Sequence, residues 1–375
     1  MSDLCLRISG SAFEGGGGLI RDSLSLASTL DTCIRIDEIR ANRPGSTGLR
    51  KEHTVAISTV ARLCGADVEG NAQRSKTLDF RPHASQPQEV PDDILNLEVE
   101  GAAGILMIAV LPYILFSGLV ARKRRSRPSI PSSGIQLNIR AGTLAIKAPS
   151  FAFLQQVFVP TLHSIGLSDN ILLSPTHEQG WHTEYFSTPG LLSVWVKPLE
   201  AHLPAFTLPV RGRVAHIIVT VHAPVEYLQE ARSVLDVDVR TYFGKYVSVM
   251  LHTTVSQAQG CYHVLLTAVT KEPWASLGYE LMYPARDGFP PEVAHDPSKL
   301  LVYLSRACIR GLQQELLRGN SVDEHMEDML SVYQALSDGF SSLEQVNASE
   351  AVKSICREEA FGELHLWSEE IDLND

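Results

Sequence analysis

The feature that most constrains this chain is a run of four glycines near its start, in the segment Glu14-Gly15-Gly16-Gly17-Gly18-Leu19-Ile20-Arg21. Glycines remove every Cβ from a turn, so backbone N–H groups can close on a ligand or on a neighbouring strand. We expect a short strand before the run (Leu4–Ile8) and a helix after it (Leu19–Leu30). The start of a helix offers unpaired N–H donors and a partial positive charge, which suit a phosphate. A plain tight turn is the alternative, because the run matches neither a Walker loop nor G-x-G-x-x-G.

Composition indicates an ordinary globular protein. The chain has 375 residues, of which 44% are hydrophobic and 20% charged, enough for one large domain and a smaller one. Its net charge is −11, so any binding of nucleic acid must use a local basic patch. The cysteines form no C-x-x-C pair, and we expect all six to be reduced thiols of an intracellular protein without a signal peptide.

One segment has two interpretations. Residues Gly101–Ala121 carry no charge over 21 positions and run into a basic stretch that begins at Arg122. Length and a basic flank are typical of a transmembrane helix. A buried core helix is favoured, because Pro112 lies in the segment and the rest of the chain has a globular pattern. The following segment, Arg122–Ser133, is predicted to be a mobile basic loop.

The order of apolar patterns predicts the domain organisation. Residues 1–80 are expected to form a β-α-β-α-β-β unit, which recurs less regularly up to about residue 198. The pattern changes over 199–277, and two helices follow at Pro297–Gly319 and Val322–Asp338, the second predicted to be capped by Ser321. The predicted fold class is α+β, with repeated units forming a large domain (1–198 and 278–375) and a smaller inserted α+β domain (199–277).

Several motifs accompany the glycine run. They are Ile39-Arg40-Ala41-Asn42-Arg43-Pro44, Gly48-Leu49-Arg50-Lys51-Glu52-His53, Gly319-x-x-Val322-Asp323-Glu324-x-x-x-Asp328-x-Leu330, Ala335-Leu336-x-x-Gly339 and Leu364-His365. Together they make the chain similar to the RNA 3'-terminal phosphate cyclase family, as a divergent member that we expect to be eukaryotic. The resemblance extends from about residue 6 to residue 370, and its first 80 residues match best.

The resemblance implies a reaction. Enzymes of the family use ATP and a divalent cation, Mg²⁺ or Mn²⁺, to adenylate a histidine. The AMP then moves to an RNA 3'-phosphate, and the neighbouring 2'-hydroxyl displaces it to give a 2',3'-cyclic phosphate. A neutral imidazole nitrogen is a good nucleophile for the first step. By the match at Leu364-His365, the resemblance assigns the adenylated histidine to His365.

The resemblance also assigns binding residues. It places Glu14 near the metal and the triphosphate, the backbone of Gly15, Gly16 and Gly17 around the phosphates, and arginines facing the phosphates at Arg21, Arg40 and Arg43. His53, His325 and Asp328 also lie at family motif positions, and His325 replaces a tyrosine that would stack on adenine. The structural alternatives are a turn carboxylate, three surface arginines, and an Asp328 side chain that pairs with His325 in solvent.

The chain departs from the family pattern at several positions, which are Gly18, Glu52, Ile108, Met329, Ala141-Gly142-Thr143-Leu144 and Ser187-Thr188-Pro189-Gly190. Ten residues follow His365, where the family has a longer helix and a closing strand. These losses favour a second hypothesis, a non-catalytic cyclase-like RNA-binding or ribosome-biogenesis factor. A carboxyvinyl transferase and a membrane-anchored protein are weaker alternatives.

RNA 3' ends are the expected partners, with pre-ribosomal or RNA-processing proteins as further candidates and no membrane. The predicted contact with the RNA backbone is the basic run Arg122, Lys123, Arg124 and Arg125. A solvated loop and a nuclear targeting patch remain open for the same run. The expected location is nuclear, in the nucleoplasm or nucleolus.

Overall fold

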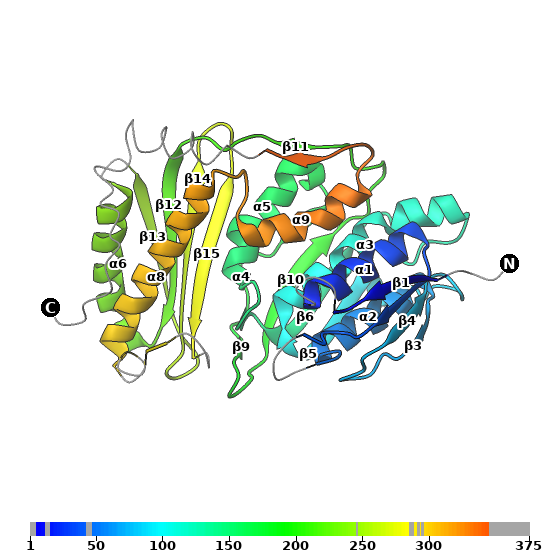
Figure 1. The fold of residues 1–375 in the computed structure, drawn as a ribbon, viewed down its shortest axis with the longest axis horizontal. Helices are drawn as coiled ribbons and strands as arrows, with labels where there is room; N and C mark the ends of the chain where they lie inside the picture. The colour runs from blue at the N-terminus through cyan, green and yellow to red at the C-terminus, as the bar shows by residue number, and fades with distance from the viewer. Residues whose placement is uncertain are drawn as a thin grey trace.

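The protein consists of two units that lie side by side (Figure 1), a larger one and a smaller one built on the sheet of residues 214–283. The computed structural model describes residues 5–11, 16–42, 47–244, 247–284, 289–290, 293 and 296–344. Its mixture of parallel and antiparallel strands with helices confirms the predicted α+β class.

The first sheet of the larger unit has the strand order β1-β2-β4-β3. Its elements are β1 (Leu6–Ser9), α1 (Gly17–Leu30), β2 (Ile34–Asp37), α2 (Lys51–Cys64), β3 (Asp67–Glu69) and β4 (Leu78–Arg81). β1 and β2 are parallel and the other pairs are antiparallel. Both helices are amphipathic, and α1 buries Ile20, Leu24 and Ala27 on one face. The C-cap of α2 is Gly65, whose φ of 68° lies in the left-handed region.

The second sheet repeats this arrangement in the order β5-β6-β10-β8. Its strands are β5 (Ile94–Ala102), β6 (Ile135–Gly142), β8 (Ile171–Leu173) and β10 (Gly190–Val196), and a short 3₁₀ turn, η1 (Pro91–Asp93), precedes β5. The helix α3 (Ala103–Arg124) connects β5 to β6. Four consecutive helical segments lie between β6 and β8, namely α4 (Phe151–Phe153), η2 (Leu154–Phe158), α5 (Val159–Leu162) and η3 (His163–Leu167). Again the first two strands are parallel and the later pairs antiparallel. The shared order supports the internal repeat that the sequence suggested.

The smaller unit has the different strand order β13-β12-β14-β15. Its elements are β12 (Val214–Ala223), η4 (Val225–Tyr227), α6 (Leu228–Phe243), β13 (Ser248–Val255), β14 (Tyr262–Thr270), β15 (Ser276–Tyr283) and α8 (Pro297–Arg318). α8 contributes buried leucines to the same apolar core as these strands. The expected boundary after residue 277 therefore falls inside β15, and α8 packs with the smaller unit rather than with the larger one.

Short elements complete the larger unit. They are β7 (Leu144–Ala145) paired with β9 (Trp181–His182), β11 (Thr207–Leu208) paired with β16 (Ser342–Leu343), and α9 (Glu324–Leu336). α9 packs against α1 and α3. Its cap is Asp323, which accepts a hydrogen bond from the Met326 amide (3.0 Å), and not Ser321, whose hydroxyl is buried without a partner among the described residues.

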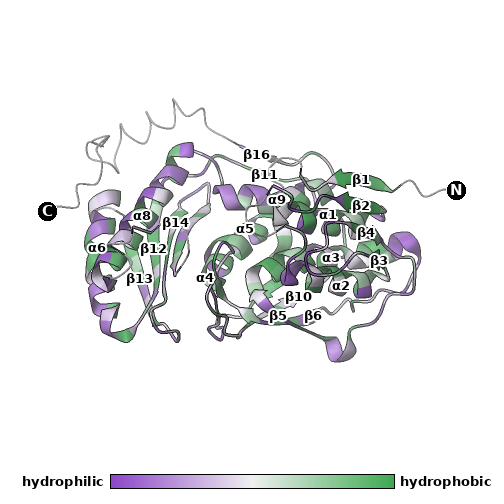
Figure 2. Ribbon diagram, turned by 60° about the horizontal axis from the view of Figure 1, so that its bottom comes forward, coloured by the Kyte–Doolittle hydropathy of each residue, from purple (hydrophilic) through white to green (hydrophobic). Residues whose placement is uncertain are grey.

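α3 is the central helix of the larger unit. It packs against α1, α2 and α9 and against β6 and β10, and hydrophobic residues gather around it (Figure 2). By length and composition α3 could cross a membrane, but 83% of its most apolar 18-residue stretch is buried inside the fold. This packing agrees with the predicted core helix. The helix continues through Arg124, so the first three residues of the predicted basic loop are helical.

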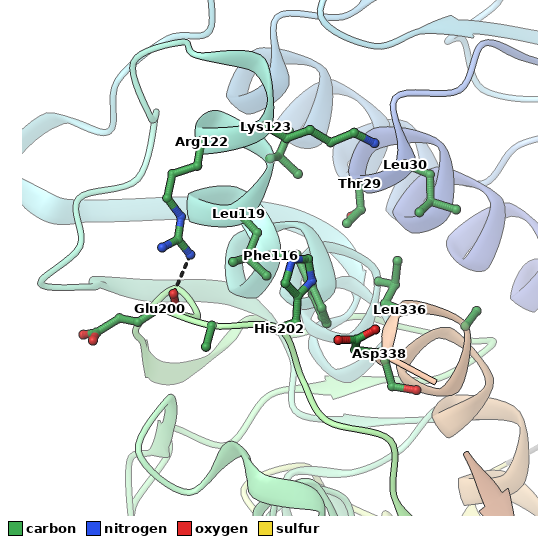
Figure 3. A pocket seen from close by; sticks show the side chains of 14 residues that line it. Thr29, Leu30, Phe116, Leu119, Arg122, Lys123, Glu200, His202, Leu336 and Asp338 are labelled. Carbon is green, nitrogen blue, oxygen red and sulfur yellow. Dashed lines mark hydrogen bonds between the residues drawn. The ribbon is translucent and has the colours of Figure 1, made fainter. Parts of the chain in front are cut away.

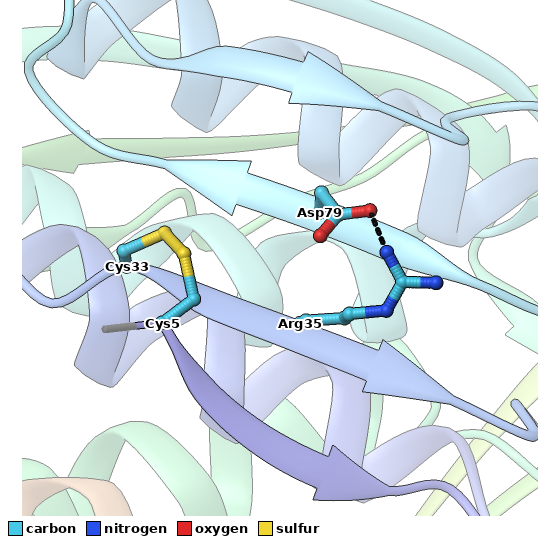
Figure 4. The surroundings of a disulfide bond; sticks show 4 residues. All are labelled: Cys5, Cys33, Arg35 and Asp79. Atoms are coloured by element: carbon cyan, nitrogen blue, oxygen red, sulfur yellow. Dashed lines mark hydrogen bonds and ion pairs between the residues drawn. A yellow bond between two sulfur atoms is a disulfide. The ribbon is translucent and has the colours of Figure 1, made fainter. Parts of the chain in front are cut away.

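Two other expectations need correction. The strand β5 was not predicted, although Leu95, Leu97 and Val99 alternate with exposed residues along it. Cys5 and Cys33 form a disulfide, so they are not reduced thiols (Figure 4). Leu6 pairs with Ile34 in the parallel ladder, which places the cysteines opposite each other with Cα atoms 4.7 Å apart. Their separation of 28 residues along the chain concealed this proximity.

The remaining cysteines differ from this pair. Three are free and buried, namely Cys64, Cys261 and Cys308. Burial raises the pKa of the Cys64 thiol to about 12, which keeps it protonated at neutral pH. The sixth, Cys356, lies outside the described residues.

The packing of α3 generates a stability prediction. Leu111 has no exposed surface, so Leu111→Ala should lower the free energy of unfolding by about 2–5 kcal/mol through lost burial and the remaining cavity. Leu172, on β8, is 66% exposed and is the matched control, for which Leu172→Ala should change stability by less than about 0.5 kcal/mol. Urea unfolding followed by circular dichroism measures both. Equal effects of the two substitutions would contradict the central position of α3.

Candidate functional site

The start of α1 is shaped for close approach by another group. Its N-cap, Gly16, has an extended backbone and provides no side-chain cap, so no side chain satisfies the first N–H groups from that position. A Cβ on Gly17 would lie 2.8 Å from Nε2 of His53, and one on Gly18 would lie 3.7 Å from the Arg21 guanidinium. Only a glycine at position 17 therefore lets His53 rest against the start of the helix.

His53 is a neutral hydrogen-bond donor at this position. Its Nδ1 accepts a hydrogen bond from the Arg50 backbone N–H (3.1 Å), so in the neutral ring the proton is on Nε2, the atom that faces Gly17. Burial is the main cause that lowers the pKa of His53 to about 3, and the charges of Arg40, Arg21 and Arg50 add to it. Three cations therefore surround an uncharged imidazole beside a helix N-terminus.

Arg21 has unused hydrogen-bonding capacity. Its Nε is buried and has no hydrogen-bond partner among the described residues. Burial lowers its pKa, whereas the carboxylates of Asp22 and Asp328 act in the opposite direction. The same burial raises the pKa of Asp22 to about 6. A buried donor without an acceptor is costly, so the arrangement favours a bound anion.

Arg40 lies at the same end of α1. Only 6% of it is exposed, its backbone is in the left-handed region with φ of 55°, and its guanidinium donates to the carbonyl of Gly48 (3.4 Å). Glycine, asparagine and aspartate are the residues that usually adopt this conformation. The turn thus holds a long cationic side chain inward.

The structure brings together most of the predicted phosphate residues that it describes: Gly16, Gly17, Arg21, Arg40, His53 and Asp328. His325 lies in the first turn of the helix that carries Asp328, and its ring lies edge-on to Phe153 with centroids 6.4 Å apart. The other predicted site residues, Glu14, Gly15, Arg43 and His365, lie outside the described residues.

The basic run lies elsewhere. Arg122, Lys123 and Arg124 form the last turn of α3, near the end of α1, where Arg124 pairs with Asp31. α1 has 14 residues and is therefore about 21 Å long, so the run and the arginine cluster are separated by about that length. The two predicted contacts with phosphates consequently belong to opposite ends of α1.

A buried polar network joins the two units. Nδ1 of His222 on β12 lies 3.2 Å from Nδ1 of His263 on β14, and Nε2 of His263 lies 2.9 Å from Glu280 on β15. Glu280 in turn accepts hydrogen bonds from the backbone N–H (3.0 Å) and the hydroxyl of Ser150 in the larger unit. Burial and the neighbouring His263 hold the pKa of His222 well below its usual range, so its ring is neutral.

Sequence reasoning missed this network, because its residues come from strands and loops far apart in the chain. Further polar contacts reinforce it: the Gln156 side chain joins Thr220 and Thr267 (2.8 and 2.9 Å). The Gly278 amide donates to Asp323 (2.8 Å), the cap of α9. The smaller sheet is therefore fixed relative to the helix that carries His325 and Asp328.

These features define a repeated-unit α+β protein with a cationic site at a glycine-rich helix start. A model of the RNA 3'-terminal phosphate cyclase family matches residues 12–360. The chain belongs to the RNA 3'-terminal phosphate cyclase family.

Three relatives show the extent of the similarity, each bearing the name RNA 3'-terminal phosphate cyclase. The protein of Desulfurococcus amylolyticus is 27% identical over 348 residues, which cover 90% of this chain and 86% of the relative. That of Methylococcus capsulatus is 30% identical over 240 residues, 61% of each chain. That of Drosophila melanogaster is 34% identical over 165 residues, 44% of this chain and 40% of the relative.

The unpaired donor of Arg21 gives a binding prediction. Because a hydrogen bond to a charged group contributes about 1.5–3 kcal/mol, Arg21→Gln should weaken binding of inorganic pyrophosphate by roughly 10- to 100-fold. Arg62→Gln, an exposed arginine near the other end of α2, is the matched control and should leave the affinity unchanged. Isothermal titration calorimetry measures both dissociation constants, and equal values for Arg21→Gln and wild type would remove Arg21 from the site.

The lowered pKa of His53 gives a pH prediction. Its folded pKa is about 3, whereas an unfolded histidine titrates near 6.5. Below about pH 6.5 the unfolded chain binds a proton at this histidine that the buried ring does not bind. The free energy of unfolding therefore falls as the pH is lowered from about 6.5 to about 3, and above about pH 6.5 His53 causes no such loss. Urea unfolding at stepped pH should show a smaller loss for His53→Gln than for wild type. NMR of ¹⁵N-labelled histidine rings in the folded protein should find His53 neutral at pH 6, and protonation near 6.5 would contradict the burial.

Proposed function

We propose that this protein is an RNA 3'-terminal phosphate cyclase that uses ATP to convert an RNA 3'-phosphate into a 2',3'-cyclic phosphate. The observation that carries the proposal is the buried Nε–H of Arg21, which has no acceptor among the described residues and belongs to the glycine-started helix α1. A phosphate oxygen would satisfy that donor and the first N–H groups of α1. The family match over residues 12–360 supports the same function.

The described residues suit the phosphates of ATP or of an RNA end. Gly17 lets the backbone approach, the neutral His53 offers Nε2–H, and Arg21 and Arg40 supply positive charge. A cationic site with neutral donors stabilises negative charge that spreads over phosphate oxygens in a transition state. His325, edge-on to Phe153, is the proposed neighbour of adenine.

Glu14 is the proposed metal ligand. Among the described residues no group of three or more His, Cys, Asp and Glu side chains could hold a metal ion. Mg²⁺ commonly binds through one or two carboxylates together with substrate phosphates, so one acidic residue near the triphosphate is a sufficient protein contribution. When bound, Mg²⁺ or Mn²⁺ would neutralise charge at phosphorus.

His365 is the proposed nucleophile. Its neutral ring nitrogen would attack the α-phosphorus of ATP, forming a P–N bond while pyrophosphate leaves. An oxygen of the RNA 3'-phosphate would then take the AMP and free the histidine. Finally the adjacent 2'-hydroxyl would attack the same 3'-phosphorus, and AMP would leave as the cyclic phosphate closes.

A second candidate is a non-catalytic cyclase-like factor that binds RNA or pre-ribosomal proteins in the nucleus. One observation favours it. Ile108, at a position where family enzymes are expected to have glutamine, is 7% exposed within α3, and Met329 packs against the core. Neither side chain can hydrogen-bond a nucleotide.

Adenylation separates the two candidates. Full-length protein is incubated with ATP labelled at the α-phosphate and Mg²⁺ or Mn²⁺, then resolved on a denaturing gel. We expect an acid-labile band in wild type that is lost in His365→Ala, because the P–N bond requires that ring. His252→Ala, on an exposed position of β13, is the control and should keep the band. Absence of the band from folded wild type would support the non-catalytic candidate.

A further inference from the structure

A cavity of about 690 Å³ lies at the far end of α1 from the arginine cluster (Figure 3). It is open to solvent on one side and is lined by the C-terminal ends of α1, α3 and α9 and by the segment that follows β10. This volume is typical of sites that bind small organic groups, which range over roughly 300–1,000 Å³. Of the residues assigned above to ATP, none that the structure describes lines it, so the cavity is distinct from the described part of the proposed active site.

The lining combines three chemistries. The inner wall is apolar, with Phe116, Val120 and Leu336 all buried. The exposed imidazole of His202 and the carboxylate of Asp338 line one side. Their positions are fixed together, because the Asp338 amide donates to the carbonyl of Leu203 (2.7 Å).

Lys123 provides positive charge on the opposite side, at the rim that α3 contributes (Figure 3). Its neighbours in the basic run are already engaged, since Arg122 donates to the Glu200 carbonyl and Arg124 pairs with Asp31. The Lys123 ammonium has no ion-pair partner among the described residues. Of the three basic residues in the last turn of α3, Lys123 is therefore the one whose charge can contact a phosphate in the cavity.

An unpaired nucleotide matches this combination. Its base has a flat apolar face that stacks on aromatic or imidazole rings, its edge carries N–H groups for a carboxylate, and its phosphate attracts an ammonium. The cavity is about 21 Å from the start of α1, the length of the 14-residue helix, and a short single strand can extend over that distance. A chain that belongs to a family of RNA end-processing enzymes would meet such a strand.

We propose that the cavity between the ends of α1, α3 and α9 is a second RNA subsite, which holds an unpaired nucleotide of a strand whose 3' end lies at the start of α1. The base stacks on His202, Asp338 accepts from its edge, and Lys123 contacts its phosphate. This inference rests on the proposed function for the position of the 3' end. The proposed subsite gives His202 and Asp338 a role in the protein's preference for RNAs of a certain length and base.

The test compares two 3'-phosphorylated RNAs, a dinucleotide and a single strand long enough to extend along α1. Fluorescence anisotropy measures the dissociation constant of each from full-length protein. Loss of one base stack costs about 1–3 kcal/mol, so His202→Ala should weaken the long strand about tenfold and leave the dinucleotide unchanged. His252→Ala, which removes an exposed imidazole from β13, is the matched control. Equal affinities of His202→Ala and His252→Ala for the long strand would overturn the subsite.

Two further readouts make the test specific. Asp338→Asn removes a negative charge, which by electrostatics alone would strengthen binding to every RNA alike, whereas a base-edge contact predicts a changed preference among bases. A photoreactive base placed upstream of the 3' end should cross-link to peptides containing Phe116, His202 or Asp338, and cross-links confined to other surfaces would refute the proposal. Adenylation from labelled ATP needs no RNA, so its presence or absence tests the proposed function separately.

Discussion

The burial of α3 is the constraint on which the rest of the structure depends. Its 22 residues are apolar on every face up to the basic last turn, so water must be excluded from all sides of the helix. The fold achieves this by packing α1, α2 and α9 around it and β6 and β10 beneath it. These contacts set the direction of α1, so that its glycine start lies at one end and its other end lies beside the basic last turn of α3.

At the glycine start, electrostatics and sterics act together. Arg21 is largely buried and Arg40 is buried near His53, and His53 avoids adding a further charge by remaining neutral. Gly17 permits this arrangement, because a Cβ at that position would lie only 2.8 Å from the imidazole Nε2 and would force it to move. This arrangement fits the proposed phosphate site, because its cations and donors are already in place and would need little reorganisation on binding.

The junction between the units contains a network of specific polar contacts. His263, held between His222 and Glu280, connects the smaller sheet to Ser150 of the larger unit. Such a network restricts relative movement of the units more than an apolar surface would, since each hydrogen bond has a preferred direction. It also adjoins the cap of α9, so the spacing between His325 and the arginine cluster depends on it.

Much of this protein was determined by the sequence alone. The glycine run, the amphipathic periods of α1 and α2 and the apolar length of α3 predicted the repeated α+β units, because local geometry and burial follow directly from residue order. The motifs at Arg21, Arg40 and His53 predicted residues that the structure brings together at the start of α1. Tertiary structure alone decided what depends on distant neighbours: the Cys5–Cys33 disulfide, the packing of α8 with the smaller sheet, and the buried histidine network. It also separated the basic run from the arginine cluster, since the packing of α1 against α3 decides which end of α1 lies beside the basic last turn of α3.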